Sequence, residues 1–282
     1  MLRNHLLLVD PQNDFCDLPE HLWHGHRPAL PVPGAYEDMR RVSGFIKHVS
    51  HQLAGITVTL DSHPFVAIER TTFWRTADGA EVAPFTEITF EQFKAGEYVP
   101  LHSAEVVEKV LQAMSEGNKS LMVWPVHCVT GTWGHNIMPD VSHAINDWEH
   151  QGHGIVNKVL KGQYPLSEHF GVFAAEVPLN DAPATHFNRE LAQTLVNGSD
   201  RLLVAGEAAS HCVAESVIQL VEGYESGKFE AENLPEIILL SDCMSPVAGF
   251  EHQYEEFLNQ VVPRGVKVMS AAQAAELLSR AL

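Results

Sequence analysis

The side chains best suited to chemistry in this chain follow the ends of short apolar runs. They are Asp10, Asp61, His63, His127, Lys161 and Cys212. In a parallel α/β sheet the carboxyl ends of the strands share one edge, and ligands bind in the crevice outside that edge. We therefore expect these side chains to converge there. Together they would provide a nucleophile with its base, and the ligand types of a divalent metal.

Cys212 lies where an apolar run ends, small residues turn the chain and a helix is expected to begin, in the segment VAGEAASHCV (residues 204–213). At a helix N-terminus the dipole lowers the pKa of a thiol and favours the thiolate. Backbone N–H groups in the same turn can face a developing oxyanion. The ordinary alternative is a buried, inert cysteine. Cys128 is a rival nucleophile beside His127, but neighbouring residues at a strand end point in opposite directions, so we expect Cys128 to be packed.

Asp10 and Lys161 could complete the chemistry of the thiol. A carboxylate at the end of a buried strand is costly unless it is paired or functional, although Asp10 could also cap the turn that follows. Lys161 would bring positive charge to the same edge, with Lys158 as a rival. In such a triad the carboxylate takes the thiol proton and the ammonium stabilises the charges.

Asp61, His63 and His127 form the second group. Asp61 and His63 are two residues apart on one strand-end loop, and His127 follows the next apolar run. One carboxylate and two imidazoles, with open positions for water or substrate, suit zinc, iron or manganese. The chain has 17 histidines, so such a spacing can also arise by chance.

The elements that must position these residues alternate along the chain. Nearly continuous apolar runs predict strands at residues 5–10, 55–60, 120–124, 154–160, 201–206, 236–241 and 266–269. Amphipathic stretches predict helices at residues 35–51, 104–117, 137–150, 188–197, 213–227, 251–262 and 271–282. This alternation is typical of a three-layer α/β/α fold with a mostly parallel central sheet. Residues 1–282 are expected to form a single domain, in which about residues 64–119 are an elaborated insertion.

Charge and composition narrow the possible partners. The formal net charge of −18 disfavours binding to nucleic acid or to anionic membranes. The sequence shows no signal peptide and no apolar run of membrane-spanning length, and its four cysteines are widely separated. We expect a cytoplasmic protein with reduced thiols, a small-molecule substrate and a homo-oligomeric state.

Five segments resemble the isochorismatase-like cysteine hydrolases, and within them the nicotinamidases. In family order they are LLVDPQNDF (7–15), LDSH (60–63), VWPVHCVTGT (123–132), KG (161–162) and AGEAASHCV (205–213). The resemblance implies a catalytic triad of Asp10, Lys161 and Cys212, and the Lys-Gly pair favours Lys161 over Lys158. It also implies a divalent metal, zinc above iron or manganese, on Asp61, His63 and His127.

The resemblance extends to the substrate pocket. It implies an oxyanion hole from the backbone N–H groups of Ala208 and Cys212, a cis peptide bond entering Ala208, and Phe15 and Trp124 on either side of a flat ring. Some nicotinamidases have a further metal-binding histidine a few residues after the D-x-H motif. Here Ala67 stands at about that place, with Glu69 and Arg70 nearby.

The implied reaction is hydrolysis of nicotinamide to nicotinic acid and ammonia through a cysteine thioester. One alternative keeps the fold and the triad but acts on another small amide, a carbamoyl compound or a ureido compound. A second is isochorismate hydrolysis without thiol chemistry, which the intact Cys212 argues against. A third is a non-catalytic binding protein, and the intact triad argues against that.

Overall fold

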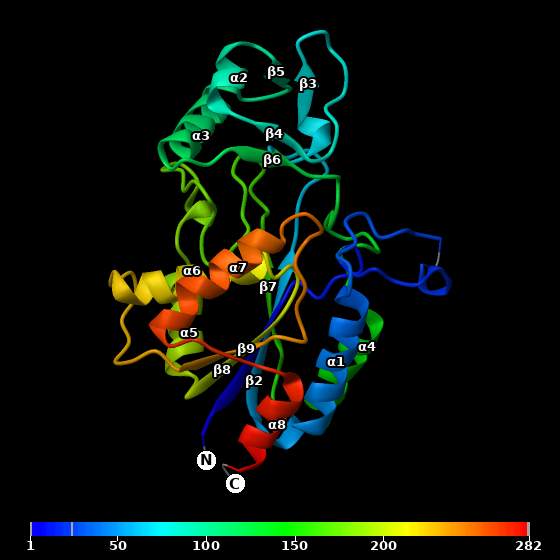
Figure 1. Ribbon diagram of the computed structural model, residues 1–282, viewed down its shortest axis with the longest axis vertical. Helices are drawn as coiled ribbons and strands as arrows, with labels where there is room; N and C mark the ends of the chain where they lie inside the picture. The colour runs from blue at the N-terminus through cyan, green and yellow to red at the C-terminus, as the bar shows by residue number, and fades with distance from the viewer. Residues whose placement is uncertain (1, 24, 281–282) are drawn as a thin grey trace.

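A parallel six-stranded sheet forms the centre of the molecule (Figure 1). The structure is a computed structural model, and it describes residues 2–23 and 25–280. The strand order is β10-β9-β8-β1-β2-β7, and every pair of neighbouring strands is parallel. The strands are β1 (Asn4–Val9), β2 (Leu53–Asp61), β7 (Asn157–Lys161), β8 (Arg201–Gly206), β9 (Glu236–Leu240) and β10 (Lys267–Met269).

The central strands are apolar on successive residues because both faces of the sheet are covered. In β1, Leu6 and Leu8 face one apolar core, whereas Leu7 and Val9 face the other. The helices that contribute to the first core are α1 (Ala35–His48), α4 (Pro139–His150) and α8 (Ala271–Ser279). Those of the second core are α5 (Arg189–Asn197), α6 (Cys212–Glu225) and α7 (Glu251–Val261). The predicted three-layer α/β/α architecture is confirmed.

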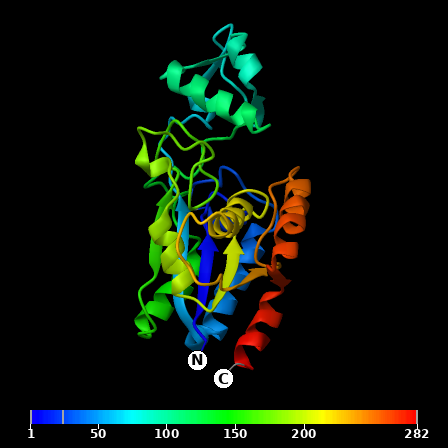
Figure 2. The same cartoon turned by 90° about the vertical axis from the view of Figure 1, so that its left-hand side faces the viewer.

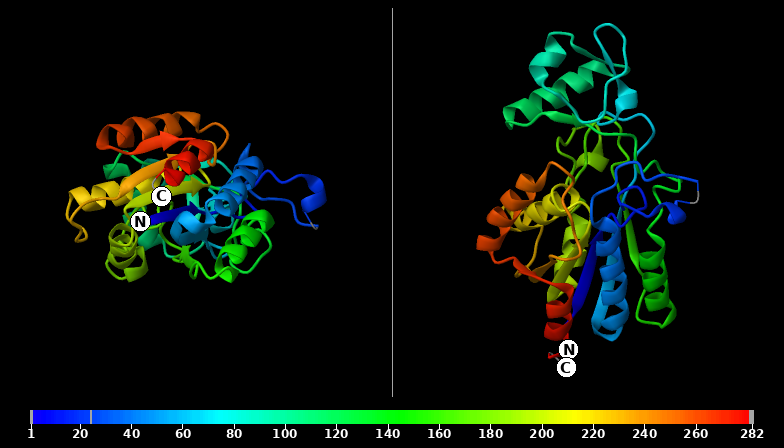
Figure 3. Two further views of the ribbon diagram at one scale, coloured as in Figure 1. Left: turned by 90° about the horizontal axis from the view of Figure 1, so that it is seen from below. Right: turned by 45° about the vertical axis from the view of Figure 1, so that its right-hand side comes forward.

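A smaller lobe is inserted between β2 and β7 and lies beyond the carboxyl ends of the central strands. In Figure 2 the arrows of β1 and β8 point towards this lobe. It contains β3 (Trp74–Thr76) paired with β5 (Tyr98–Pro100), β4 (Thr86–Ile88) paired with β6 (Leu121–Val123), and the helices α2 (Phe90–Lys94) and α3 (Ala104–Glu116). The lobe has its own apolar cluster, which includes Phe73, Trp74 and Leu111. Both chain ends lie at the opposite end of the molecule (Figure 3).

The lobe corrects one predicted strand. Residues 120–124 were expected to form a core strand, but β6 pairs in antiparallel fashion with β4 inside the lobe. A short apolar run fits a buried strand in either environment, so its sequence does not identify its sheet. The other predicted core strands are confirmed with small shifts of their ends, and the last two residues of the predicted helix 271–282 lie outside the described residues. The single domain with an insertion stays a prediction.

Single turns of 3-10 helix complete the path of the chain. They are η1 (Glu20–Leu22), η2 (Ser50–Gln52), η3 (Thr71–Phe73), η4 (Pro183–Thr185) and η5 (Val262–Arg264). Among the residues that the structure describes, no helix has the length and apolar character needed to cross a membrane.

Candidate active site

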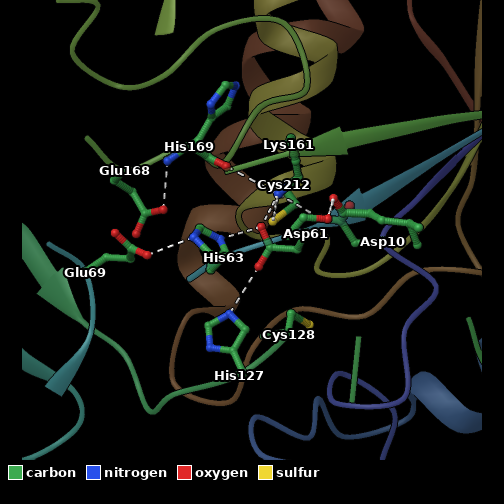
Figure 4. Close-up of polar contacts among 12 residues, drawn as sticks. Asp10, Asp61, His63, Glu69, His127, Cys128, Lys161, Glu168, His169 and Cys212 are labelled. Carbon is green, nitrogen blue, oxygen red and sulfur yellow. Dashed lines mark hydrogen bonds and ion pairs between the residues drawn. The ribbon is translucent and has the colours of Figure 1, made fainter. Parts of the chain in front are cut away.

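Lys161 connects the predicted triad at the carboxyl edge of the sheet (Figure 4). Its Nζ lies 2.9 Å from Asp10 Oδ2 and 3.5 Å from Cys212 Sγ. The same ammonium donates to Asp61 Oδ1 at 2.8 Å and to the His169 carbonyl at 3.3 Å. The structure therefore brings Asp10, Lys161 and Cys212 together, as the sequence predicts, and each of the three side chains is buried.

Three adjacent strands, β1, β2 and the edge strand β7, fix the acidic side of this arrangement. Asp10 follows β1 with a φ of 44°, which turns its carboxylate back to accept a 2.5 Å hydrogen bond from the Thr59 hydroxyl on β2. Lys161 is the last residue of β7 and pairs in register with Asp61 at the end of β2. Gly162 must then be glycine, because its φ is +78° and a Cβ would lie 2.5 Å from the His63 ring.

Cys212 is the first residue of α6 and follows a tightly bonded turn. Gly206, at the start of that turn, has a φ of +120°, and a Cβ there would lie 1.9 Å from the Val9 carbonyl. The Glu207–Ala208 peptide bond is cis, as the resemblance predicts. Within the described part of the chain, neither the Ala208 nor the Cys212 N–H donates to another protein group. Both N–H groups are therefore available to a substrate oxygen.

Burial dominates the ionisation of the triad. It raises the pKa of the Cys212 thiol well above its usual value, and the nearby Lys161 ammonium only partly opposes this effect. Burial also raises the pKa of Asp10, again against the influence of Lys161. Although burial lowers the pKa of Lys161, the Asp10 and Asp61 carboxylates raise it well above its usual value. The expected thiol acidification by the helix terminus is thus outweighed, and Cys212 needs a base in contact to lose its proton.

The three predicted metal ligands also lie together. Asp61 Oδ1 is 2.7 Å from His63 Nε2, and Asp61 Oδ2 is 3.3 Å from His127 Nε2. The opposite nitrogens of the two rings contact other groups, His63 Nδ1 in an ion pair and His127 Nδ1 in a hydrogen bond. His63 Nδ1 is 2.8 Å from Glu69 Oε1, and His127 Nδ1 is 2.8 Å from the Pro125 carbonyl.

This group nevertheless does not fit a metal ion as it stands. Among the residues the structure describes, no set of three or more His, Cys, Asp or Glu side chains could hold one. The physical reason is a buried cation, because Arg70 NH1 contacts the His127 ring, 3.1 Å from Nε2, and Arg70 NH2 is 4.0 Å from Asp61 Oδ2. A dication bound by Asp61 and His127 would lie beside this guanidinium in a water-poor site, where like charges repel strongly.

A cavity adjoins the triad, and Cys212 is part of its wall. Phe15, Trp124, Ala208 and Cys212 are among the residues that line it. The ring of Phe15 lies 5.2 Å from that of His127, and the ring of Trp124 lies 5.1 Å from that of His211. The cavity therefore combines an aromatic wall with the thiol and both free N–H groups.

The other cysteines are packed away from this chemistry. Cys128 is fully buried, and burial raises the pKa of its thiol well above the usual value. Its backbone N–H is held by Asp14 Oδ2 at 2.7 Å. Cys16 and Cys243 are buried too, and all four cysteines are free thiols.

Several residues of the site were not assigned a role from the sequence. Arg70, Glu69 and Glu168 line the cavity, as do Phe170 and His211. Most of them are in irregular segments that only the tertiary fold brings to the sheet edge. A polar residue within an apolar stretch, such as Glu69 or Arg70 after Val66, Ala67 and Ile68, is the one local signal that could have indicated them.

The chain is similar to known nicotinamidases. No family model matches the chain. The nicotinamidase of Saccharomyces cerevisiae is 24% identical over 222 residues, which cover 78% of this chain and 83% of that protein. The fold is that of the isochorismatase-like hydrolases. One such hydrolase, from Alkaliphilus metalliredigens, matches with a TM-score of 0.52 at 15% identity and 98% coverage of both chains.

Within that fold, nicotinamidase structures match over nearly their whole length. The yeast nicotinamidase bound to the inhibitor nicotinaldehyde has a TM-score of 0.64 at 18% identity, covering 95% of this chain and 99% of that one. The pyrazinamidase of Pyrococcus horikoshii in complex with zinc has a TM-score of 0.51 at 20% identity, with the same two coverages. The resemblance stated from the sequence is thus confirmed, and it supports a hydrolase of amide bonds.

Proposed function

We propose that this protein hydrolyses nicotinamide to nicotinic acid and ammonia through a thioester on Cys212. The observation that carries the proposal is the position of Lys161 Nζ, 2.9 Å from Asp10 and 3.5 Å from the Cys212 sulfur. A thiol, its base and a shared cation are therefore assembled together, and the thiol is in the wall of the cavity. The similarity to nicotinamidases supports nicotinamide as the substrate among small amides.

Asp10 acts as the base in this proposal. Because burial raises the pKa of Cys212, the thiol stays protonated until a base in contact accepts its proton. Burial also raises the pKa of Asp10, which makes it a stronger base than an exposed carboxylate. Transfer of the proton from Cys212 to Asp10 moves one negative charge between two partners of Lys161, so the ammonium stabilises the charge before and after the step.

The thiolate then attacks the carboxamide carbon, and the C=O π bond opens to place negative charge on oxygen. The N–H groups of Ala208 and Cys212 bind that oxygen, and such donors are each worth about 3–4 kcal/mol in other hydrolases. As the C–N bond breaks, Asp10 returns its proton to the leaving nitrogen, which departs as ammonia. Asp10 next takes a proton from water, whose oxygen attacks the thioester carbon. The C–S bond then breaks to release nicotinic acid, and Asp10 returns its proton to the Cys212 sulfur.

Phe15 and Trp124 orient the substrate in this scheme. Both rings line the cavity and are almost fully buried. A pyridine ring held against them would place its carboxamide towards Cys212 and the two N–H groups, which lowers the entropic cost of attack. The divalent metal expected from the resemblance has no part in these steps, because Arg70 lies beside its predicted ligands.

Ammonia release from nicotinamide by purified protein tests the proposal, with nicotinic acid measured in the same samples. We expect equal amounts of the two products. Cys212→Ala should bind nicotinamide without turning it over. If folded protein releases no ammonia from nicotinamide but does so from another small amide, a carbamoyl compound or a ureido compound, the fold and triad stand and nicotinamide is rejected as the substrate.

A further inference from the structure

Arg70 is a fully buried cation inside the candidate site, and it is held there by the lobe. The exposed fraction of Arg70 is 0%. It comes just before η3, at the start of the lobe, and forms a parallel bridge with Trp124. The neighbouring Glu69 carbonyl accepts a 2.7 Å hydrogen bond from the Trp124 N–H. The backbone on both sides of Arg70 is therefore fixed relative to the aromatic wall of the cavity.

The guanidinium is only partly satisfied by the protein. NH1 donates to the Pro125 carbonyl at 3.2 Å, whereas Nε forms an ion pair with Glu69 Oε1 at 3.1 Å without a hydrogen bond. NH2 is buried and has no hydrogen-bond partner among the described residues. A buried guanidinium nitrogen that lacks an acceptor is costly unless a ligand provides one. Because Arg70 lines the same cavity as Cys212, a bound substrate can provide it.

The predicted metal ligands already have protein partners that balance their charge. Asp61 Oδ1 accepts from Lys161 and contacts His63, while Asp61 Oδ2 faces His127 (Figure 4). Asp61 Oδ2 also lies 4.0 Å from Arg70 NH2. His63 lies between two carboxylates, those of Asp61 and Glu69. The positive charge that a metal would bring to these carboxylates is thus supplied by the side chains of Arg70 and Lys161.

We propose that the Arg70 guanidinium takes the place of the divalent metal in this protein. It anchors the far end of the substrate by donating a hydrogen bond from NH2 to an acceptor, which is the ring nitrogen in nicotinamide. The site is therefore metal-independent, and it favours amides that carry an acceptor on the side opposite the carboxamide. The identity of the amide in this inference rests on the proposed function. The replacement of the metal by Arg70 is independent of that function.

The first test is metal analysis of the wild-type protein, expressed with zinc, iron and manganese in the medium and then titrated with zinc alone. We expect far less than one equivalent of any of these metals, and no change in nicotinamide binding after treatment with a strong chelator. One equivalent of tightly bound metal that is lost in His127→Ala would overturn the proposal. This readout needs no catalytic activity, so it remains decisive if nicotinamide is not the substrate.

The second test compares nicotinamide with benzamide, which has the same shape but lacks the ring nitrogen. Binding is measured by calorimetry in the Cys212→Ala protein, so that no turnover interferes. We expect the Kd of nicotinamide to be lower than that of benzamide by roughly 10- to 100-fold, the contribution of a hydrogen bond to a charged group. Adding Arg70→Met should remove this preference, whereas Arg70→Lys should retain part of it.

A matched variant separates the effect of Arg70 on substrate binding from its effect on the stability of the fold. Arg70→Met removes the cation beside Glu69 and leaves this buried carboxylate with only the His63 ring as a partner, which destabilises the fold. The double change Glu69→Gln and Arg70→Met removes both charges together and so protects the fold. If this variant is folded and still prefers nicotinamide to benzamide, Arg70 is not the anchor. If the wild type binds neither amide, the proposed substrate fails, and the metal analysis alone decides whether the guanidinium replaces the metal.

Discussion

Asp10 is the residue whose charge is most directly tied to the proposed chemistry. It is buried between Thr59 and Lys161, which hold its two oxygens. Asp10→Asn keeps the size of the side chain but removes the proton acceptor. We expect kcat to fall roughly 10²- to 10⁴-fold, the range for a lost general base. The melting temperature and nicotinamide binding serve as controls for folding, and a variant within a few-fold of wild-type kcat would remove Asp10 from the mechanism.

Glu207 is a second buried carboxyl group, and the peptide bond between Glu207 and Ala208 is cis. Burial and the neighbouring Asp38 carboxylate raise the pKa of Glu207 well above its usual value. The folded protein therefore keeps a proton that the unfolded chain releases. The stability from this group is complete below the unfolded pKa of about 4.3 and is lost as pH rises towards the folded pKa.

Glu207→Gln should flatten this pH dependence, because its amide cannot ionise. Between about pH 5 and pH 8, the free energy of unfolding of the wild type should fall relative to that of the variant. The fall should be about 1.4 kcal/mol per pH unit as long as the pH is below the folded pKa of Glu207. Denaturant unfolding of both proteins at several pH values measures the difference. Parallel curves would show that Glu207 ionises alike in the folded and unfolded states.

At the scale of elements, the turn after β7 is set by the Lys161-Gly162 pair. Gly162 has a φ of +78° and faces the His63 ring, whereas Gly227 has a φ of +68° and open space where a Cβ would stand. Gly227→Ala should cost about 1 kcal/mol for the backbone conformation alone. Gly162→Ala should cost more than this control and should also lower kcat/KM, since the His63 ring must move. Equal effects on stability and activity would contradict this account of the turn.

The residues of the site that lie at strand ends could be predicted from the sequence. Asp10, Asp61 and Lys161 each end or follow a strand of the parallel sheet, so their meeting follows from the pattern of apolar runs alone. His127 reaches the same edge by another route, through the loop after β6 and a bridge between His63 and Val129. The position of Arg70 and the high pKa of Cys212 depend on tertiary burial, which a local pattern of residues does not encode.

At the scale of the whole molecule, the lobe closes one side of the candidate site and carries Arg70 and Trp124. Trp74 lies in the apolar cluster of the lobe and is fully buried, and its Nε1–H donates to the Ile68 carbonyl at 2.6 Å. Trp148, on α4, is equally buried but belongs to the core beneath the central sheet. The two tryptophans therefore offer a matched pair of positions.

Trp74→Leu and Trp148→Leu should each destabilise the protein by about 2–4 kcal/mol, because a large buried side chain is lost. Only Trp74→Leu is expected to weaken nicotinamide binding by the folded protein, since it loosens the lobe that positions Arg70 and Trp124. Calorimetric binding, measured at a temperature where both variants are fully folded, separates the two effects. Equal affinities in the two variants would show that the lobe does not control the pocket.

The central claim is that Cys212 is the nucleophile, and a comparison of two cysteine variants tests it most directly. Cys212 and Cys128 are both buried at the same end of the sheet, but only Cys212 lies within 3.5 Å of Lys161 Nζ. The rate of ammonia release from nicotinamide should fall to background in Cys212→Ala and stay within a few-fold of wild type in Cys128→Ala. Full activity in Cys212→Ala, or loss of activity only in Cys128→Ala, would contradict the account.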